Sequence, residues 1–336
     1  MKTLICSAPR QFEYAQIPEP EPIKNHAIIK IKRVGICGTD LHAYEGTQPF
    51  FSYPRILGHE LSGEIVACDD TAFKIGDAVT IMPYFSCGSC IACRRGKPNC
   101  CAQINVFGVH IDGGMKEYIS VPTQYLIHGE GLNYDELALV EPLAIGAHGV
   151  RRAGLQPEDF VLVIGAGPIG IGTMELAAVS GAKVIALDIN ETRLKFCKEQ
   201  LGVHATINAT DNNALEQIKA LTNNDMPTTV IDATGNLKAI NNGIHYLAHG
   251  GNYVLIGLQK EAFSFSHPEF HKRETTLMSS RNATKEDFKF VIANLKAGKI
   301  NPKNYITHTV TFDEVKEHFE SWLRPETGVI KAMVHL

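Results

Sequence analysis

The stretch FVLVIGAGPIG at residues 160–170 joins a continuous apolar segment to three closely spaced glycines. Residues 160–164 predict a buried β-strand, because an unbroken apolar run has no polar face to offer to solvent. A helical stretch at residues 169–180 follows the glycines. A strand, a glycine turn and a helix in this order predict the first unit of a parallel α/β sheet.

The residues that follow repeat this alternation of strands and helices. Strands are expected at residues 183–187, 229–231 and 252–256, and a charged helix at residues 191–200. Such alternation indicates a doubly wound parallel sheet of the Rossmann type. We therefore predict the α/β class and assign this domain to residues 146–284.

The glycines have the spacing G-x-G-x-x-G. Gly165 permits a tight turn, Gly167 lets the backbone approach a pyrophosphate, and Gly170 allows the helix to pack closely on the strand. The N-terminus of the helix offers unpaired N–H groups to phosphate oxygens. The motif, which includes Pro168 and Ile169, predicts a dinucleotide site. A glycine turn that binds nothing is the alternative.

Asp188 ends the second predicted strand. A carboxylate there can accept hydrogen bonds from the ribose hydroxyls of NAD, and it would repel the additional phosphate of NADP. Arg193 keeps NADP open, because arginine can bind that phosphate. We expect NAD. Thr234 follows another predicted strand and is expected on the nicotinamide side, with an ordinary turn as the alternative.

Residues 1–145 contain short apolar runs separated by glycine and proline. Residues 27–31 form one such run, and residues 76–83 are typical of a turn, a strand and a strand-ending proline. The tail ends in a predicted strand at residues 328–334. We expect a β-rich domain at residues 1–145, to which residues 285–336 return.

Four cysteines with the spacing C-x2-C-x2-C-x7-C lie in one short segment. They are Cys87, Cys90, Cys93 and Cys101. Four thiolates so close in sequence can surround one tetrahedral Zn²⁺ from a single loop. A disulfide pair is the alternative, but disulfide frameworks belong to small secreted chains, and this chain has nine cysteines in 336 residues. We predict a closed structural zinc site in a lobe at residues 85–103, with Cys100 as a spare thiol.

A second, mixed set of metal-binding residue types precedes this lobe. Cys37 lies in GICGTDLH, and His59 and Glu60 lie in GHE. Thiolate, imidazole and carboxylate together are typical of catalytic zinc, which keeps one position open for water or substrate. Each of the three residues alone is more often structural, so the prediction depends on their combination.

Composition and charge limit the kinds of partner. The formal net charge of −4 gives no basic excess for nucleic acid. No apolar run approaches the roughly 20 residues that span a bilayer, and the N-terminal apolar run is too short for a signal peptide. Free thiols without an export signal are typical of a reducing cytoplasm. We expect a cytoplasmic protein whose partner is a small molecule.

The order and spacing of these motifs resemble the zinc-containing medium-chain dehydrogenases of the alcohol and polyol dehydrogenase superfamily, over essentially the whole chain. The matching segments are residues 35–40, 58–60, 141–143 and 232–235, the cysteine lobe, and the glycine turn with Asp188. The resemblance implies a Rossmann domain and a GroES-like catalytic domain. It also implies an alcohol dehydrogenase with one catalytic zinc, one structural zinc and NAD, assembled as a homodimer or homotetramer.

The resemblance also implies a ligand set for the catalytic zinc. Cys37 and His59 would bind the metal. Chains with GHE followed by EPL resemble sorbitol and threonine dehydrogenases, in which Glu60 can be a direct ligand. Glu141 would be either a ligand or the residue that holds a zinc-bound water. The quartet would form the closed structural site.

Two further residues receive catalytic roles from the resemblance. Thr39 would contact the substrate hydroxyl, and His42 would pass the proton to solvent through the cofactor ribose. A surface polar side chain is the alternative for His42. Zinc would act as a Lewis acid that favours loss of the alcohol proton, and the nicotinamide would accept the hydride.

Further segments resemble a narrower group, the L-galactonate 5-dehydrogenase-like enzymes and their starvation-sensing relatives. They are residues 48–55, 108–114, 270–274 and 280–284. This resemblance implies oxidation of L-galactonate to D-tagaturonate. A sugar acid needs a cation for its carboxylate, and Arg281 is the first candidate and Arg55 the second, each with a structural or surface role as the alternative. Sorbitol-like polyols and L-threonine are alternative substrates, and a catalytically silent zinc- and NAD-binding protein is the alternative of another class.

Overall fold

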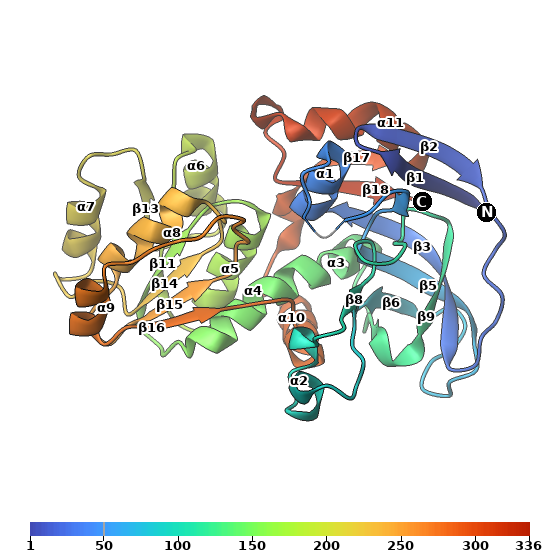
Figure 1. The fold of residues 1–336 in the computed structure, drawn as a ribbon, viewed down its shortest axis with the longest axis horizontal. Coiled ribbons are helices and arrows are strands. Elements are labelled where there is room, and N and C mark those ends of the chain that lie inside the picture. The colour runs from blue at the N-terminus through green and yellow to red at the C-terminus, as the bar shows by residue number, and fades with distance from the viewer. Residues whose placement is uncertain (50) are drawn as a thin grey trace. The chain divides into compact units, whose positions relative to one another are not determined.

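The structure is a computed structural model that describes residues 1–49 and 51–336. These residues form two compact units, each of which is shown in Figure 1. Unit 1 comprises Met1–Glu141 with Ala283–Leu336, and unit 2 comprises Pro142–Asn282. The sequence analysis places the corresponding boundaries after residues 145 and 284.

Unit 2 is built on a six-stranded parallel sheet. Its strands are β11 (Phe160–Ile164), β12 (Lys183–Asp188), β13 (Ala205–Asn208), β14 (Thr229–Asp232), β15 (Asn252–Leu255) and β16 (Thr276–Ser279). They lie in the order β13-β12-β11-β14-β15-β16, which is the order of doubly wound dinucleotide-binding sheets. The predicted α/β class is therefore confirmed. Val161, Leu162 and Val163 of the central strand β11 are fully buried, as an unbroken apolar run predicts.

Apart from α4, which precedes β11, the helices of unit 2 follow its strands, so that strands and helices alternate along the chain. They are α4 (Val140–Ala153), whose first two residues belong to unit 1, α5 (Pro168–Val179), α6 (Glu191–Gln200), α7 (Ala214–Leu221), α8 (Leu237–Gly243), the 3₁₀ helix η3 (Ile244–Tyr246) and α9 (His267–Arg273). The core between them contains Leu162, Ile185, Val230 and Tyr253, each fully buried. Helix α5 begins directly after the glycine turn, as the motif predicts.

Unit 1 is mainly β-structure. Its strands are β1 (Lys2–Ala8), β2 (Gln11–Gln16), β3 (His26–Ile36), β4 (Arg55–Ile56), β5 (Glu60–Cys68), β6 (Ala78–Ile81), β7 (Tyr84–Phe85), β8 (Asn105–Val106), β9 (Tyr118–Pro122), β10 (Leu126–His128), β17 (Ile306–Thr311) and β18 (Lys331–His335). The main sheet has the order β10-β6-β5-β3-β18-β17, with β9 also paired to β3. The C-terminal strand β18 thus lies against β3 in antiparallel register.

Short helices connect the strands of unit 1. They are α1 (Gly38–Glu45), α2 (Ile91–Arg94), α3 (Tyr134–Ala138), α10 (Lys285–Lys296) and α11 (Val315–His318), with the 3₁₀ helices η1 (Pro98–Cys100), η2 (Thr123–Tyr125), η4 (Pro302–Tyr305), η5 (Phe312–Glu314), η6 (Phe319–Leu323) and η7 (Pro325–Thr327). Helix α1 follows β3 without a loop, so the chain turns from sheet to helix at Cys37. This turn positions the first predicted zinc ligand.

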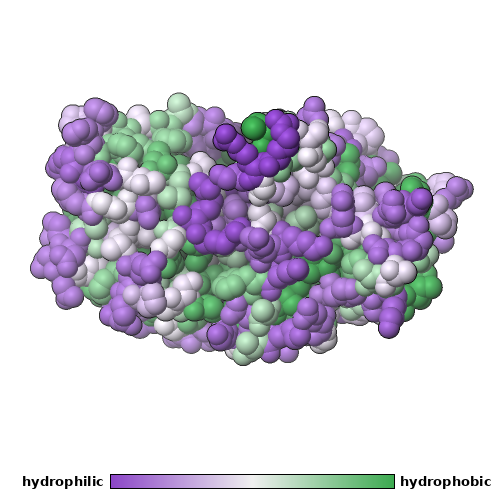
Figure 2. Space-filling model, turned by 90° about the horizontal axis from the view of Figure 1, so that it is seen from below, coloured by the Kyte–Doolittle hydropathy of each residue, from purple (hydrophilic) through white to green (hydrophobic). Residues whose placement is uncertain are grey.

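The surface is mixed in polarity. Hydrophilic residues are interspersed with hydrophobic ones over the face shown in Figure 2. Among the described residues no helix has both the length and the apolar character needed to cross a membrane.

Candidate active site and metal centres

Three neighbouring strands of unit 1 bring the mixed metal set together. Strand β3 lies between β5 and β18, with Gly35 opposite Glu60 on one side and Ile36 opposite Ala332 on the other. Cys37 follows the end of β3, and Glu60 is the first residue of β5. Residues that are far apart in sequence therefore meet at one end of this sheet.

Cys37, His59 and Glu60 form a compact cluster. Their ligand atoms all lie within 4.8 Å of one another, and the His59 and Glu60 side chains are buried. His59 Nδ1 is buried and has no hydrogen-bond partner among the described residues. Thiolate, imidazole and carboxylate ligand atoms this close together fit a mixed zinc site.

Asp40 orients two parts of this cluster. Its carboxylate accepts hydrogen bonds from the backbone N–H groups of Cys37, at 2.9 Å, and Gly58, at 3.1 Å. It also lies 3.6 Å from His59 Nδ1. A carboxylate behind metal ligands fixes their orientation and strengthens binding. The sequence analysis gave Asp40 no role, although an acidic residue in the first turn of a helix that starts at a cysteine was an available signal.

The electrostatic field of the cluster favours a cation. Burial alone would lower the pKa of His59, but the Asp40 carboxylate and the Cys37 thiolate outweigh burial and raise this pKa well above its usual value. In the metal-free cluster, a proton on His59 is therefore favoured by the negative charges of its neighbours. A divalent cation would replace that proton, because zinc binds the neutral imidazole and the thiolate.

Lys331 neutralises Glu60. Its Nζ lies 2.6 Å from both Glu60 oxygens and donates to the Ile36 carbonyl at 3.1 Å, and both side chains are almost completely buried. Burial would lower the pKa of Lys331, but Glu60 and Cys37 raise it, so the ammonium stays charged. Space for the carboxylate depends on Gly35, where a Cβ atom would lie 2.2 Å from Glu60 Oε2. The sequence analysis missed Lys331.

Glu141 lies in the first turn of α4 and is buried. The Tyr84 hydroxyl donates a hydrogen bond to its Oε1. Burial raises the pKa of Glu141 to about 7; His59 opposes this rise and Glu60 adds to it. The charges of the cluster therefore act on the pKa of Glu141. Glu141 is not one of the residues whose ligand atoms all lie within 4.8 Å of one another. The role of Tyr84 was also missed from the sequence.

The two predicted catalytic residues lie on α1. Thr39 is half-buried in its first turn. His42 is exposed, and its Nδ1 lies 3.3 Å from Thr47 Oγ1 and 3.6 Å from Glu45 Oε2. An exposed imidazole can exchange a proton with solvent, which is the chemistry expected of His42.

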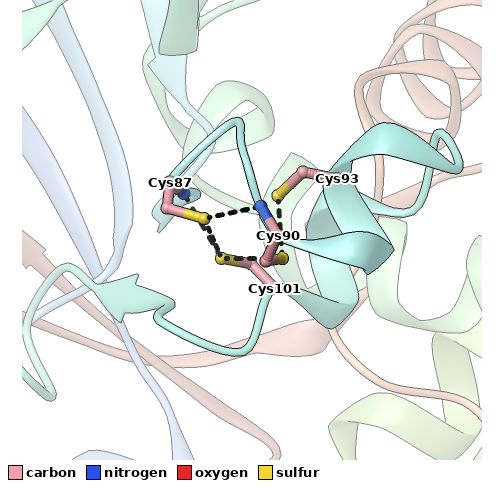
Figure 3. Close-up of side chains that lie close together, drawn as sticks. All are labelled: Cys87, Cys90, Cys93 and Cys101. Carbon is pink, nitrogen blue, oxygen red and sulfur yellow. Dashed lines mark hydrogen bonds between the residues drawn. The ribbon is translucent and has the colours of Figure 1, made fainter.

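The cysteine quartet is assembled as the spacing predicts (Figure 3). Sulfur atoms on a tetrahedral zinc with bonds of about 2.3 Å lie about 3.8 Å apart. The sulfur of Cys90 lies 3.5 Å from that of Cys93 and 3.9 Å from that of Cys101, which lies 3.4 Å from that of Cys87. These separations fit a four-thiolate zinc site and are too long for a disulfide bond.

The glycine turn of unit 2 has the shape of a phosphate cradle. Gly165 has a φ of 98°, and its close approach to Thr234 leaves no space for a Cβ atom. A Cβ atom on Gly170 would lie 1.8 Å from the Gly165 carbonyl oxygen. A Cβ atom on Gly167 would have nothing closer than Arg193 Nη1, at 4.0 Å. Gly167 therefore borders open space at the N-terminus of α5, where a pyrophosphate fits.

The remaining predicted cofactor residues lie around this cradle. Pro168 and Ile169 open helix α5. Asp188 accepts hydrogen bonds from the N–H groups of Ala166, at 2.5 Å, and Asn190, at 2.8 Å, so its carboxylate is held at the glycine turn. Thr234 is tied to Asp232 through its hydroxyl group, at 2.9 Å from Oδ2.

The two predicted substrate arginines differ in their surroundings. Arg281 is an exposed residue of unit 2. Arg55, in unit 1, donates to Ser52 Oγ at 2.8 Å and lies 3.6 Å from Asp112. Phe50, from the segment that resembles the sugar-acid enzymes, lies outside the described residues.

Comparison with known families agrees with both units. Residues 23–130 match the alcohol dehydrogenase GroES-like domain, and residues 168–297 match the zinc-binding dehydrogenase domain. The GroES-like fold predicted for the catalytic domain is thus confirmed.

Individual relatives match along almost the whole chain. L-galactonate-5-dehydrogenase of Escherichia coli K12 is 44% identical over 99% of this chain and 98% of its own length. Sorbitol dehydrogenase of Halalkalibacterium halodurans is 33% identical over 90% of each chain. The solved structure of the short chain alcohol dehydrogenase rspB of Escherichia coli CFT073 with NADH has a TM-score of 0.93 and 31% identity, covering 100% of this chain and 99% of that one.

The reaction type follows from these likenesses and from the two sites. The mixed cluster and the quartet fit zinc, and the cradle of unit 2 fits a nicotinamide dinucleotide. The chain therefore belongs to the zinc-binding alcohol dehydrogenase family and is an oxidoreductase that acts on CH–OH groups.

Proposed function

We propose that the chain oxidises a secondary alcohol of a sugar acid similar to L-galactonate, giving a keto sugar acid similar to D-tagaturonate, with NAD as the hydride acceptor. The observation that carries the proposal is the whole-length likeness, at 44% identity, to L-galactonate-5-dehydrogenase. The buried cluster of Cys37, His59 and Glu60 supports the reaction type. Three protein ligands on a tetrahedral zinc would leave its fourth position for the substrate.

The residues of unit 1 divide the work of handling the alcohol. Cys37 and His59 would hold the zinc, with a carboxylate completing its ligand set. The zinc, when bound, supplies Lewis acidity that favours loss of the alcohol proton. The hydroxyl oxygen of Thr39 would accept a hydrogen bond from the substrate hydroxyl and so orient it. His42 would release the proton to solvent.

The choice of NAD over NADP is assigned to Asp188. Its carboxylate is already fixed at the glycine turn by two backbone N–H groups. A negative charge held in this place would accept the ribose hydroxyls and repel a phosphate. Arg193, whose Nη1 lies near Gly167, would contribute positive charge to the same cradle.

The carboxylate of a sugar acid is assigned to Arg281 ahead of Arg55. Arg55, which donates to Ser52 Oγ and lies 3.6 Å from Asp112, is the second candidate. We expect Arg281→Ala to raise KM for L-galactonate much more than KM for sorbitol, because only the acid needs a cation. Arg152→Ala, at another exposed position of unit 2, is the matched control.

Polyol oxidation is the second candidate. The 33% identity to sorbitol dehydrogenase favours it. The test is the rate of NADH formation with L-galactonate, related aldonates, sorbitol, other polyols and L-threonine. We expect the highest kcat/KM for the aldonates. A higher value for sorbitol or L-threonine would replace the proposed substrate by that compound.

We also infer that the protein works in the cytoplasm as a homodimer or homotetramer. The nine free cysteines support a reducing compartment. Sedimentation of the purified protein measures the oligomeric state, and a monomer would contradict this part of the proposal.

A further inference from the structure

We infer that Tyr84 is a positioning residue for Glu141, through which the base of the cysteine lobe determines how strongly the catalytic metal is bound. The inference rests on the proposed function, because it assumes that Cys37 and His59 hold that metal. Tyr84 has no role in the sequence motifs of either metal site.

The contact itself is a buried bond between a neutral donor and a carboxylate. Tyr84 is 4% exposed, and its hydroxyl donates to Glu141 Oε1. A phenol remains protonated near neutral pH and therefore acts here as the donor. Bonds from a donor to a carboxylate are stronger than neutral ones, and a water-poor site strengthens them further. The Glu141 side chain is consequently held in one orientation.

The two glutamates of the site are held in different ways. Lys331 contacts both oxygens of Glu60 and cancels its charge. Tyr84 engages Oε1 of Glu141 and brings no charge. The bond to Tyr84 occupies Oε1, so the proposed contact of Glu141 with the metal, or with a water on the metal, would be made through Oε2. On this basis Tyr84 sets how Glu141 faces the metal that Cys37 and His59 would hold.

Tyr84 also belongs to the base of the lobe. Strands β7 and β8 pair through Tyr84 with Val106 and Phe85 with Asn105, and this short ladder closes the lobe. The backbone N–H of Ser86 donates to the Tyr125 hydroxyl at 2.9 Å, just before Cys87. The ligand loop of the closed zinc site therefore starts a few residues from the tyrosine that holds Glu141.

The test compares Tyr84→Phe with Tyr125→Phe. Both changes remove one phenol oxygen at the base of the lobe, but only Tyr84 contacts Glu141 among the contacts described. Metal affinity is measured by chelator competition and by the visible spectrum of the Co²⁺-substituted protein. We expect Tyr84→Phe to weaken the open site by about 10–100-fold, as is usual for such supporting residues, with the lobe metal retained. We expect Tyr125→Phe to leave the open site unchanged.

A double-mutant cycle makes the test specific. In a Glu141→Ala background, Tyr84→Phe should have no further effect on metal affinity, because its partner is gone. The inference would be overturned if Tyr84→Phe lowered metal affinity as much in the Glu141→Ala background as in the unaltered protein. It would also be overturned if Tyr125→Phe lowered the metal affinity of the open site as much as Tyr84→Phe does. Should Tyr84→Phe fail to fold, Glu141→Ala probes the same bond from the other side, and unchanged metal affinity there would also overturn it. Failure of the proposed function would be recognised by a different result. In that case the Cys37→Ser variant would still bind two metal ions per chain, which would show that Cys37 holds neither of them.

Discussion

Charge compensation at single buried residues determines what the open site can hold. The cluster combines a thiolate at Cys37 with carboxylates at Asp40 and Glu60, and their surroundings exclude most water. Lys331 compensates one of these negative charges. A divalent cation would balance the other two, whereas a proton on His59 balances only one of them. The site therefore selects a cation through its charge as well as through its ligand types.

The buried pair of Lys331 and Glu60 gives a prediction about stability. Lys331→Met leaves Glu60 as an uncompensated buried charge, so we expect the free energy of unfolding to fall by about 3–5 kcal/mol. Adding Glu60→Gln removes that charge and should restore much of the loss. Denaturant unfolding of the metal-loaded proteins measures both effects. If Lys331→Met alone were as stable as the original protein, the charge of Lys331 would not be needed to compensate Glu60.

A second prediction at this scale concerns Asp188. Asp188→Ser removes the carboxylate proposed to bind the ribose, so the preference for NAD over NADP should fall at least tenfold in kcat/KM, mainly through better use of NADP. Asp225→Ser, at an exposed position of the same unit, is the matched control. An unchanged cofactor ratio in Asp188→Ser would remove Asp188 from the cofactor site.

At the level of elements, the glycine turn and helix α5 together form the proposed phosphate-binding site. Gly165 and Gly170 are required by the fold itself, because a Cβ atom at either position would collide with neighbouring atoms. Gly167 has open space around it and a φ of −77°, which any residue can adopt. We therefore propose that glycine serves ligand binding rather than folding at this position.

This difference can be tested with two alanine variants. Gly167→Ala should keep the unfolding temperature and lose at least tenfold in NADH affinity, because its Cβ atom would occupy the space of the pyrophosphate. Gly170→Ala should instead destabilise the protein. Calorimetric titration with NADH and thermal unfolding measure the two effects. Normal NADH affinity in Gly167→Ala would place the dinucleotide elsewhere.

The cysteine lobe is a separate element with a closed metal site. Its four sulfurs would occupy all positions on a tetrahedral zinc, so no substrate can reach that metal. The lobe supports function indirectly, since β7 at its base contains Tyr84. Cys100, which is exposed beside the quartet, is not part of the ligand set.

Over the whole molecule, the strands that could be predicted are those marked by a continuous apolar run, such as β11. Strand β11 and helix α6 form where the pattern predicts them. The edge strands β13 and β16 have only four residues each. Most positions of β13 are half-buried, and those of β16 are half-buried or exposed, so no continuous apolar run marks them. Their existence follows from pairing with neighbouring strands rather than from their own residues.

The same limit applies to the site. The quartet is local in sequence and could be predicted from its spacing. The open site was predicted from the combination of Cys37, His59 and Glu60, and its ligand roles from the family resemblance. Lys331 is 271 residues from Glu60, and Tyr84 is 57 residues from Glu141. Neither has a neighbour in sequence that indicates its role. Only the sheet register and the position of α4 bring these pairs together.

We propose that the reaction takes place at the open site of Cys37 and His59 and that none takes place at the closed cysteine site. The most direct measurement is the zinc content of Cys37→Ser, with NADH formation from L-galactonate followed in the same samples and Cys90→Ser as the counterpart in the lobe. We predict two zinc ions per chain in the unaltered protein. Cys37→Ser should keep one zinc and a normal unfolding temperature and show no turnover, whereas Cys90→Ser should lose the lobe zinc and stability. Full zinc content or persisting turnover in Cys37→Ser would contradict the claim.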